Sequence, residues 1–233
     1  MENQSLGVLV CSQLRRRHVK TDLIFERENF SHHDFQNATF KNCHFYMCSF
    51  DHADLRDAKF IDCRFIESKA LEGCSFRFAN LKDASFTNCM LAMSLFNGAN
   101  CMGLELRKCD LKGANFQGAN FANRVSNTMF FCSAFITGCN LTYCNFERVL
   151  LEKCDLFENR WNGANLAGAT LKGSDLSRCE FSPEQWGTFN VEQCDLTHVE
   201  LDGLDVRRVS LFGVKICDWQ QEQLLAPFGL IIL

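Results

Sequence analysis

The fold of this chain is decided in its middle, by the stretch Cys109-Asp110-Leu111-Lys112-Gly113-Ala114-Asn115-Phe116-Gln117-Gly118-Ala119-Asn120-Phe121. In steps of five, it gives a small residue, then Asn or Asp, then Leu or Phe, then two mostly polar positions that often end in Gly. We call the Leu or Phe the centre of each repeat. Centres recur at every fifth residue from Phe25 to Phe65, and again, one residue out of phase, from Phe76 to Ile216. An internal repeat of this extent sets the architecture of the chain.

A period of five matches neither the 3.6-residue period of an α-helix nor the two-residue period of a β-strand. Neither element alone would keep every centre on one buried face. A coil with four flat sides of five residues does so, because each centre then points at the common axis once per side. Successive square turns can hydrogen-bond as short β-bridges about 4.8 Å apart. The sequence therefore predicts an all-β, four-sided β-helix whose lumen is filled by Phe and Leu.

The residue two positions before each centre also points inward, near a corner, and has to be small. Ala and Cys share this position, and eleven of the fifteen cysteines occupy it. Free Cys is a good small buried residue, so we expect reduced, structural thiols in a reducing compartment rather than a disulfide scaffold. The eleven are Cys43, Cys48, Cys63, Cys74, Cys89, Cys109, Cys139, Cys144, Cys154, Cys179 and Cys194.

The sequence carries no recognisable catalytic or metal-binding motif. It lacks a Gly-x-Ser-x-Gly elbow, a phosphate-binding loop and a His-Glu-x-x-His helix. Cys43, His44, Cys48 and His52 have the chemistry of zinc ligands, but on a square coil the cysteines point inward while the histidines belong to mostly outward positions. We therefore expect no metal, no cofactor, no small-molecule substrate and no enzymatic activity.

The formal net charge of −4 is unevenly distributed. Residues 1–21 precede the repeat and hold Arg15, Arg16, Arg17 and Lys20 against Glu2 alone, whereas the rest of the chain carries 27 acids and 20 bases, a net charge of −7. An acidic rod should not bind nucleic-acid phosphates directly, and we interpret the basic triplet as a solvated terminal cluster. No apolar segment suits a signal peptide or a membrane span, so we expect a soluble, cytoplasmic protein.

The repeat is interrupted twice. Eleven residues instead of five separate Phe65 from Phe76, which predicts a loop at Ile66, Glu67, Ser68, Lys69, Ala70, Leu71 and Glu72. The segment Ala122–Ser133 is either two irregular repeats or, as we favour, a ten-residue insertion that carries Asn123, Arg124, Val125, Ser126, Asn127, Thr128, Met129 and Phe130. Counting sides places the two loops on different corners, about two and a half turns apart.

These loops are the predicted partner-binding residues, because a solenoid's departures from its repeat often form its binding surface. The alternative is that both are tolerated decorations, since long surface insertions cost little free energy.

The five-residue repeat ends at Ile216. Asp218, with Gln221 three residues later, predicts the N-cap of a short helix that Pro227 ends. A solenoid must cover its last turn. A plain cap would do this, but the apolar tail at 228–233 favours a homodimer through this end. The predicted interface residues are Trp219, Leu224, Leu225, Phe228 and Leu230. The expected organisation is thus an extension at 1–21, a β-helix at 22–217 and a dimerisation tail at 218–233.

The five-residue unit is that of the pentapeptide repeat family, which the chain resembles over most of its length. Within that family it resembles the Qnr quinolone-resistance proteins from about residue 18 to the end, and residues 1–17 depart from them. The resemblance is carried by Phe-Ile-Glu-Ser from Phe65, Cys-Asp-Leu-Lys-Gly-Ala-Asn-Phe from Cys109, Phe-Cys-Ser-Ala from Phe131, Leu-Glu-Lys-Cys from Leu151, Gly-Ser-Asp-Leu-Ser from Gly173 and Gly-Val-Lys-Ile-Cys-Asp-Trp-Gln-Gln-Glu-Gln-Leu-Leu from Gly213.

The resemblance implies a cytoplasmic bacterial protein that binds DNA gyrase and topoisomerase IV and protects them from fluoroquinolones. It also implies a right-handed quadrilateral β-helix that is dimeric through its C-terminal helix, with two loops needed for protection. Those loops fall on Ile66–Glu72 and Ala122–Ser133 of this chain, and the dimer helix falls on Trp219–Leu225.

The charge of the rod suggests how such a protein would act. An acidic rod about as wide as a nucleic-acid duplex can occupy a basic DNA-binding saddle, with a two-fold dimer matching a two-fold enzyme. Competition with DNA alone would inhibit the enzyme, so we expect the loops to engage it near the drug-stabilised cleavage complex and to favour drug release. The alternative function is a structural or interaction module with another partner, such as an immunity protein against a peptide gyrase poison.

Overall fold

The computed structural model describes residues 19–67, 71–125 and 129–229. The basic triplet Arg15–Arg17 and nearly all of the expected N-terminal extension lie outside these residues. The first strand, β1 (Val19–Thr21), pairs in parallel with β3 (Thr39–Lys41) of the next turn. The described coil therefore begins three residues before residue 22.

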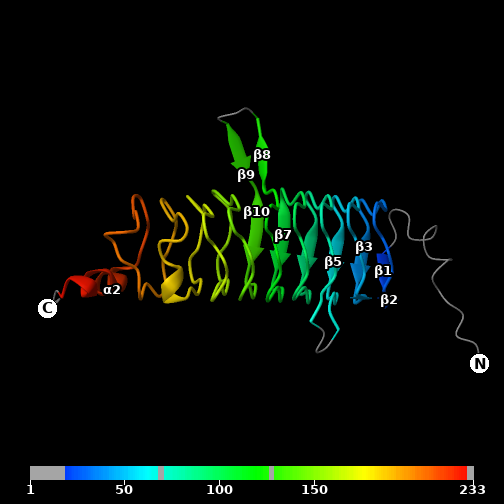
Figure 1. The fold of residues 1–233 in the computed structure, drawn as a ribbon, viewed down its shortest axis with the longest axis horizontal. Coiled ribbons are helices and arrows are strands. Elements are labelled where there is room, and N and C mark those ends of the chain that lie inside the picture. The colour runs from blue at the N-terminus through cyan, green and yellow to red at the C-terminus, as the bar shows by residue number, and fades with distance from the viewer. Residues whose placement is uncertain (1–18, 68–70, 126–128, 230–233) are drawn as a thin grey trace, which may run out of the picture.

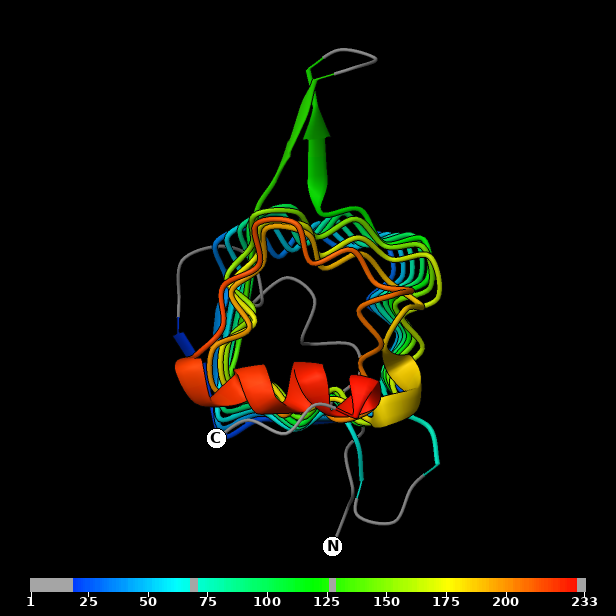
Figure 2. The same ribbon diagram turned by 90° about the vertical axis from the view of Figure 1, so that its left-hand side faces the viewer.

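The chain winds into a square coil, elongated in Figure 1 and viewed along its axis in Figure 2. One side carries a six-stranded parallel sheet in the order β1-β3-β5-β6-β7-β10, and the next side begins with the pair β2-β4. Elsewhere the turns are joined by isolated parallel bridges, such as those between Asn29 and Ser49 and between Asp34 and Asp54. The predicted all-β, right-handed quadrilateral β-helix is confirmed. Its remaining strands are β2 (Ile24–Glu26), β4 (His44–Tyr46), β5 (Lys59–Ile61), β6 (Ser85–Thr87), β7 (Leu104–Arg107) and β10 (Ala134–Thr137).

The repeat centres fill the lumen as columns of stacked side chains. In one column Phe76, Phe96 and Phe116 follow one another on successive turns, with ring centroids 5.0 and 4.5 Å apart and planes within 2°. All three are fully buried. Burial of each such ring contributes about 1.5–3 kcal/mol. Because each ring contacts only its own turn and the neighbouring turns, the stability of the rod is the sum of many local terms.

The corner cysteines do more than fill space. The Cys89 thiol donates to the carbonyl of Thr87 and to that of Phe60 in the preceding turn, both at 3.4 Å. Asn159 and Ser174 take the same corner position and also donate to carbonyls of the preceding turn. Cys is therefore favoured over Ala where a corner carbonyl would otherwise be buried without a donor. The fourteen cysteines of the described chain are all free thiols.

The position two residues after most centres adopts a left-handed conformation, with glycine and other residue types alike. Phe78 has φ of 56° and Gly98, one turn later, has φ of 66°. The ring of Phe78 lies over Gly98, where an added Cβ would come within 2.5 Å of a ring carbon. Tyr143 covers Gly163 in the same way. Glycine is needed at these two corners to make room for the ring of the preceding turn.

The predicted cap of the C-terminal helix is wrong by one residue. The N-cap is Cys217, whose N–H donates to Oε1 of Gln220 at 2.6 Å. The amide nitrogen of the buried Gln220 donates to two carbonyls of the preceding turn. Asp218 and Gln221 do not form the expected box, because Gln220 is the residue whose side chain bonds both to the N-cap and to the preceding turn. The end consists of η2 (Asp218–Gln220), α2 (Gln221–Leu225) and η3 (Ala226–Phe228).

Gln185, in η1 (Pro183–Gln185), makes the same set of side-chain hydrogen bonds earlier in the chain. Its Oε1 accepts the N–H of Ser182 at 2.7 Å, and its Nε2 donates to the carbonyls of Trp161 and Ala164.

Candidate functional site

The first insertion leaves the coil between Phe65 and Phe76, which are both fully buried. Its base is closed by a hydrogen bond from the N–H of Cys74 to the carbonyl of Phe65 at 3.1 Å. Gly73 returns the chain so close to the next turn that an added Cβ would lie 2.5 Å from the carbonyl oxygen of Ala92. Ile66 is half-buried, Glu67 and Glu72 are exposed, and Leu71 is 84% exposed. The predicted residues Ser68, Lys69 and Ala70 lie outside the described chain.

The second insertion is a β-hairpin that stands out from the rod (Figure 1). Its strands, β8 (Ala122–Arg124) and β9 (Phe130–Cys132), pair in antiparallel fashion. The N–H of Ser133 donates to the carbonyl of Phe121 at 3.1 Å and closes its base. In two consecutive bridges, Asp110 pairs with Asn140 and Asn115 pairs with Asn145. The two partners of each bridge are thirty residues apart in the sequence, instead of the twenty of a regular turn. The ten-residue insertion is therefore confirmed, and the alternative of two irregular repeats is wrong.

Three apolar side chains are exposed among the described residues of this hairpin. Val125 is 63% exposed, Met129 62% and Phe131 49%, while Asn123 is also exposed. Phe131 was not among the predicted site residues, although the alternation of Met129 and Phe131 is the period of a half-exposed strand. The backbone of Arg124 lies in β8, and Ser126, Asn127 and Thr128 lie outside the described residues.

The two insertions project from diagonally opposite corners, as Figure 2 shows. Ten repeat steps separate Phe65 from Phe121, which at four steps per turn is two and a half turns, or about 12 Å along the axis. The expectation that they occupy different corners is confirmed.

Three exposed methionines surround the base of the first insertion, and none of them is among the predicted site residues. Met47 and Met93 lie at the same corner as loop 66–72, one turn before it and one turn after it, and are 50% and 41% exposed. Met90, on the adjoining side, is 38% exposed. We call Met47, Met90 and Met93 the methionine collar. Their place relative to the repeat centres was available in the sequence, but their exposure depends on what stacks on them.

The C-terminal end presents a third group of exposed apolar side chains. Trp219 is 52% exposed and Phe228 47%, whereas Leu224 packs against the core and Leu225 is half-buried. Leu230 lies outside the described residues. Phe212 was not predicted and is 70% exposed. It directly follows the repeat centre Leu211.

The outer surface is rich in carboxylates and ion pairs. On one side of the coil, the backbones of Asp155, Asp175 and Asp195 form parallel β-bridges from one turn to the next. The Arg56 guanidinium, 2.6 Å from Asp54, lowers the pKa of that carboxyl by hydrogen bonding. The same kind of contact from Arg207, at 2.8 Å, lowers the pKa of Asp205 to about 2. Asp54 and Asp205 are therefore ionised at neutral pH and paired with arginine, and the net negative charge of the chain comes from its excess of acidic over basic residues.

The four residues with the chemistry of zinc ligands, Cys43, His44, Cys48 and His52, do not point toward a common site. The Cys43 thiol donates to backbone carbonyls inside the coil, and His44 Nδ1 lies 3.0 Å from the hydroxyl of Tyr46. The ring of His52 is stacked between His32 and Phe78. Across the part of the chain that the structure describes, no group of three or more His, Cys, Asp or Glu residues is placed to hold a metal ion.

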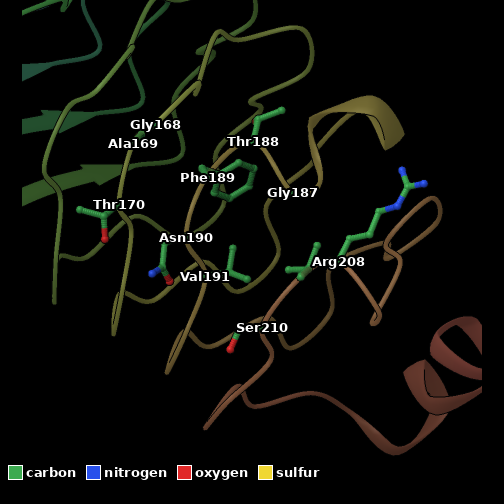
Figure 3. Close-up of a pocket in the computed structure, with 11 residues that line it drawn as sticks. Gly168, Ala169, Thr170, Gly187, Thr188, Phe189, Asn190, Val191, Arg208 and Ser210 are labelled. Carbon is green, nitrogen blue, oxygen red and sulfur yellow. The ribbon is translucent and has the colours of Figure 1, made fainter.

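A shallow hollow of about 380 Å³ near the C-terminal turns contains no convergent reactive groups among the described residues (Figure 3). Thr170, Asn190 and Ser210 line it from successive turns. Its single charged side chain, Arg208, extends away from the polar groups and lies 3.7 Å from Asp205. A nucleophile and a base within hydrogen-bonding reach, which covalent catalysis requires, are not brought together there.

None of the helices in residues 19–67, 71–125 and 129–229 has the length and apolarity needed to cross a bilayer.

Comparisons with known proteins give consistent matches. The family described as "Pentapeptide repeat region" matches residues 38–116, and that described as "Pentapeptide repeats (8 copies)" matches residues 160–182. Pentapeptide repeat protein VPA0095 of Vibrio parahaemolyticus serotype O3:K6 (strain RIMD 2210633) is 99% identical over 215 residues, which are 92% of this chain and 100% of that protein. Pentapeptide repeat protein QnrB4 of Escherichia coli is 45% identical over 81 residues, which are 35% of this chain and 38% of that protein.

Among solved structures, full-length QnrB1, described as a plasmid-mediated fluoroquinolone resistance protein, superposes with a TM-score of 0.88 at 43% identity. The match covers 91% of this chain and 100% of QnrB1.

Proposed function

Because this chain belongs to the pentapeptide repeat family and is a Qnr-like member of it, we propose that it binds the type II topoisomerases DNA gyrase and topoisomerase IV and protects them from fluoroquinolones. The observation that carries this proposal is the similarity to QnrB1, a fluoroquinolone resistance protein whose entire length is matched. Protection by binding would confer quinolone resistance on a cell that makes the protein.

The negative charge of the rod supports partial mimicry of DNA. The row of Asp155, Asp175 and Asp195 repeats its carboxylates at the spacing of the turns, about 4.8 Å. A regular row of negative charge on a rod about as wide as a duplex is complementary to a basic saddle that normally holds DNA. The mimicry is partial because the two insertions have no counterpart in a duplex.

The insertions supply the contacts that distinguish protection from simple inhibition. Leu71 on the first loop, and Val125 and Met129 on the hairpin, expose apolar side chains, which suit a protein surface rather than a phosphate backbone. In the proposed mechanism these contacts engage the enzyme near the drug-stabilised cleavage complex and favour release of the drug, while the acidic rod occupies the saddle.

We place the homodimer interface at the C-terminal end, through Trp219, Leu224, Leu225, Phe228 and Leu230. Trp219 and Phe228 are half-exposed on the single chain, and aromatic side chains are typical of interface centres. Phe212, 70% exposed near the same end, extends the proposed interface. A two-fold dimer built this way would match the two-fold symmetry of its target.

The proposed activity needs neither a cofactor nor a chemical step by this protein. Its targets act on chromosomal DNA, so the protein would work in the bacterial cytoplasm. Free thiols throughout the described chain fit that reducing compartment.

A DNA supercoiling assay tests the function. Gyrase is incubated with relaxed plasmid and an inhibitory concentration of ciprofloxacin, with and without the protein at a molar ratio near one. We expect the protein to restore supercoiling without abolishing it in the absence of drug. Unchanged inhibition by ciprofloxacin for both gyrase and topoisomerase IV would overturn the proposal.

A further inference from the structure

The placement of the two insertions restricts the shape of any partner that contacts both. Loop 66–72 lies at the corner between the sides centred on Phe65 and Phe76, and the hairpin lies at the corner between the sides centred on Phe121 and Ile136. Figure 2 shows that these corners face in opposite directions across the square section. A flat or convex surface that touches one of them cannot reach the other, because the filled lumen lies between them.

The base of each insertion is fixed at its own corner of the rod. The first is closed at its base by the hydrogen bond from Cys74 to Phe65 and by the tight contact of Gly73 with the next turn. The hairpin is closed at its base by the bond from Ser133 to Phe121 and continues as a paired two-stranded sheet. The core beneath both is fully buried and close-packed. The diagonal arrangement is therefore a fixed property of the rod.

Both corners carry exposed apolar side chains. At the first, Leu71 and the methionine collar are exposed, and thioethers adapt readily to a protein surface. At the second, Val125, Met129 and Phe131 are exposed on the hairpin. Clusters of exposed apolar side chains mark interaction sites on soluble proteins. Each corner therefore has contact chemistry of its own.

We infer that the partner holds each rod between two facing walls, one in contact with Leu71 and the methionine collar and the other in contact with the exposed apolar side chains of the hairpin, Val125, Met129 and Phe131. This rests on the proposed function and specifies its geometry: the topoisomerase would offer a cleft formed by two domains or subunits, each with an apolar patch. The two patches would be offset by about 12 Å along the rod, the distance that two and a half turns span. The acidic sides between the corners would face the basic floor of the cleft.

Site-specific photo-crosslinking tests the inference. Two full-length proteins carry benzoylphenylalanine in place of Leu71 or in place of Val125, and each is irradiated with gyrase holoenzyme and DNA. We expect the crosslinked peptides of the two proteins to map to different domains or subunits, with no shared surface. Crosslinks from both positions to one contiguous surface would overturn the inference, as would crosslinking from only one of two proteins that both bind.

Two controls separate this inference from the proposed function. Benzoylphenylalanine in place of Phe78, an exposed ring at a corner with no insertion, gives the background for a surface position, and excess unlabelled protein must suppress the crosslinks from positions 71 and 125. If neither the parent protein nor its variants bind gyrase or topoisomerase IV in a pull-down, the proposed function fails together with the inference. If they bind and protect, but both positions mark one surface, only the two-wall geometry fails.

Discussion

The ring of Phe96 lies on the ring of Phe116 in the next turn, with centroids 4.5 Å apart and planes within 2°. This is the tightest of the stacked ring pairs that run along the lumen. Phe146 continues the column at 4.6 Å from Phe116. Because each turn rests on the next through such contacts, a gap in one layer is felt by the layers on both sides of it.

Truncating Phe116 should therefore destabilise the rod strongly. We expect Phe116→Ala to lower the free energy of unfolding by about 3–5 kcal/mol. Phe116→Leu should cost clearly less, because Leu166 fills the same column further along. Urea unfolding followed by circular dichroism measures both. Equal losses for the two variants would contradict the account of the lumen as a packed column.

Asn159 offers a direct test of why polar and sulfur side chains occupy the corners. Its Nδ2 donates to the carbonyls of Ile136 and Leu156 at 2.6 and 2.7 Å, and its Oδ1 accepts the N–H of Cys139 at 2.8 Å. Asn159→Ala leaves the Ile136 carbonyl and the Cys139 N–H buried without these partners, at about 1–3 kcal/mol for each unsatisfied group, whereas the Leu156 carbonyl keeps the Cys179 thiol as a donor. Asn159→Cys restores the donor and acceptor that the other corners use, so we expect it to recover at least half of the loss.

Urea unfolding followed by circular dichroism measures the stability of the Asn159→Ala and Asn159→Cys variants. The substitution Asn165→Ala, at an exposed asparagine, is the matched surface control. A Cys variant no more stable than the Ala variant would show that thiols at the corners act only as space fillers.

Removing each insertion while keeping the repeat in register should abolish protection and leave the fold intact. Deleting residues 123–132 joins Ala122 to Ser133 and restores the five-step spacing from Phe121 to Ile136. Deleting residues 67–72 joins Ile66 to Gly73 and does the same between Phe65 and Phe76. We expect both proteins to keep their circular dichroism but to lose rescue of supercoiling in ciprofloxacin.

A deletion of residues 123–131 is the control for register. It leaves a spacing of six, turns the following centres away from the lumen, and should unfold the C-terminal half. Retained protection after the in-register hairpin deletion would refute the role assigned to that loop.

The C-terminal aromatic side chains should hold the dimer together. We expect the double substitution Trp219→Ser and Phe228→Ser to convert a dimer into a monomer of 26.6 kDa, because it removes two half-exposed rings from the proposed interface. Phe78→Ser removes an equally exposed ring from the middle of the rod and should leave the dimer unchanged. Sedimentation velocity distinguishes the two outcomes, and a wild-type protein that sediments as a monomer would refute the interface.

The buried thiols of Cys154, Cys179 and Cys194 should resist both ionisation and modification. Burial raises the pKa of Cys154 and Cys179 to about 12 and that of Cys194 to about 11. A pKa raised in the folded state favours the neutral thiol, so its stabilising effect is complete below the unfolded pKa of about 8.5 and is lost as pH rises towards the folded value. We therefore expect stability to fall progressively above about pH 8.5.

Alkylation with iodoacetamide at pH 7.5, mapped by peptide mass spectrometry, checks the accessibility of the thiols. The half-buried Cys132 and Cys217 should be modified in the native protein, and Cys154, Cys179 and Cys194 only after unfolding. Rapid native modification of Cys154 would contradict its burial.

Much of this molecule could be predicted from the spacing of its residues. The five-residue period assigns each centre, such as Phe116, to a side of the square, because side-chain direction in a flat coil depends only on position within the repeat. A break in the period, as after Phe65 or Phe121, then has to leave the coil at a known corner. Local order of this kind sufficed for the fold and for the diagonal placement of the two insertions.

Other features depend on contacts between residues about twenty positions apart. The hydrogen bonds of Gln220 in place of an Asp218 cap, the covering of Gly98 by Phe78 and the exposure of the methionine collar are all set by what lies on the adjacent turn. The sequence alone determined the square lumen and the corners from which the loops emerge, since the repeat fixes direction. Only the tertiary structure decided which polar groups close the ends and which apolar side chains face solvent, because those outcomes require neighbouring turns to be stacked.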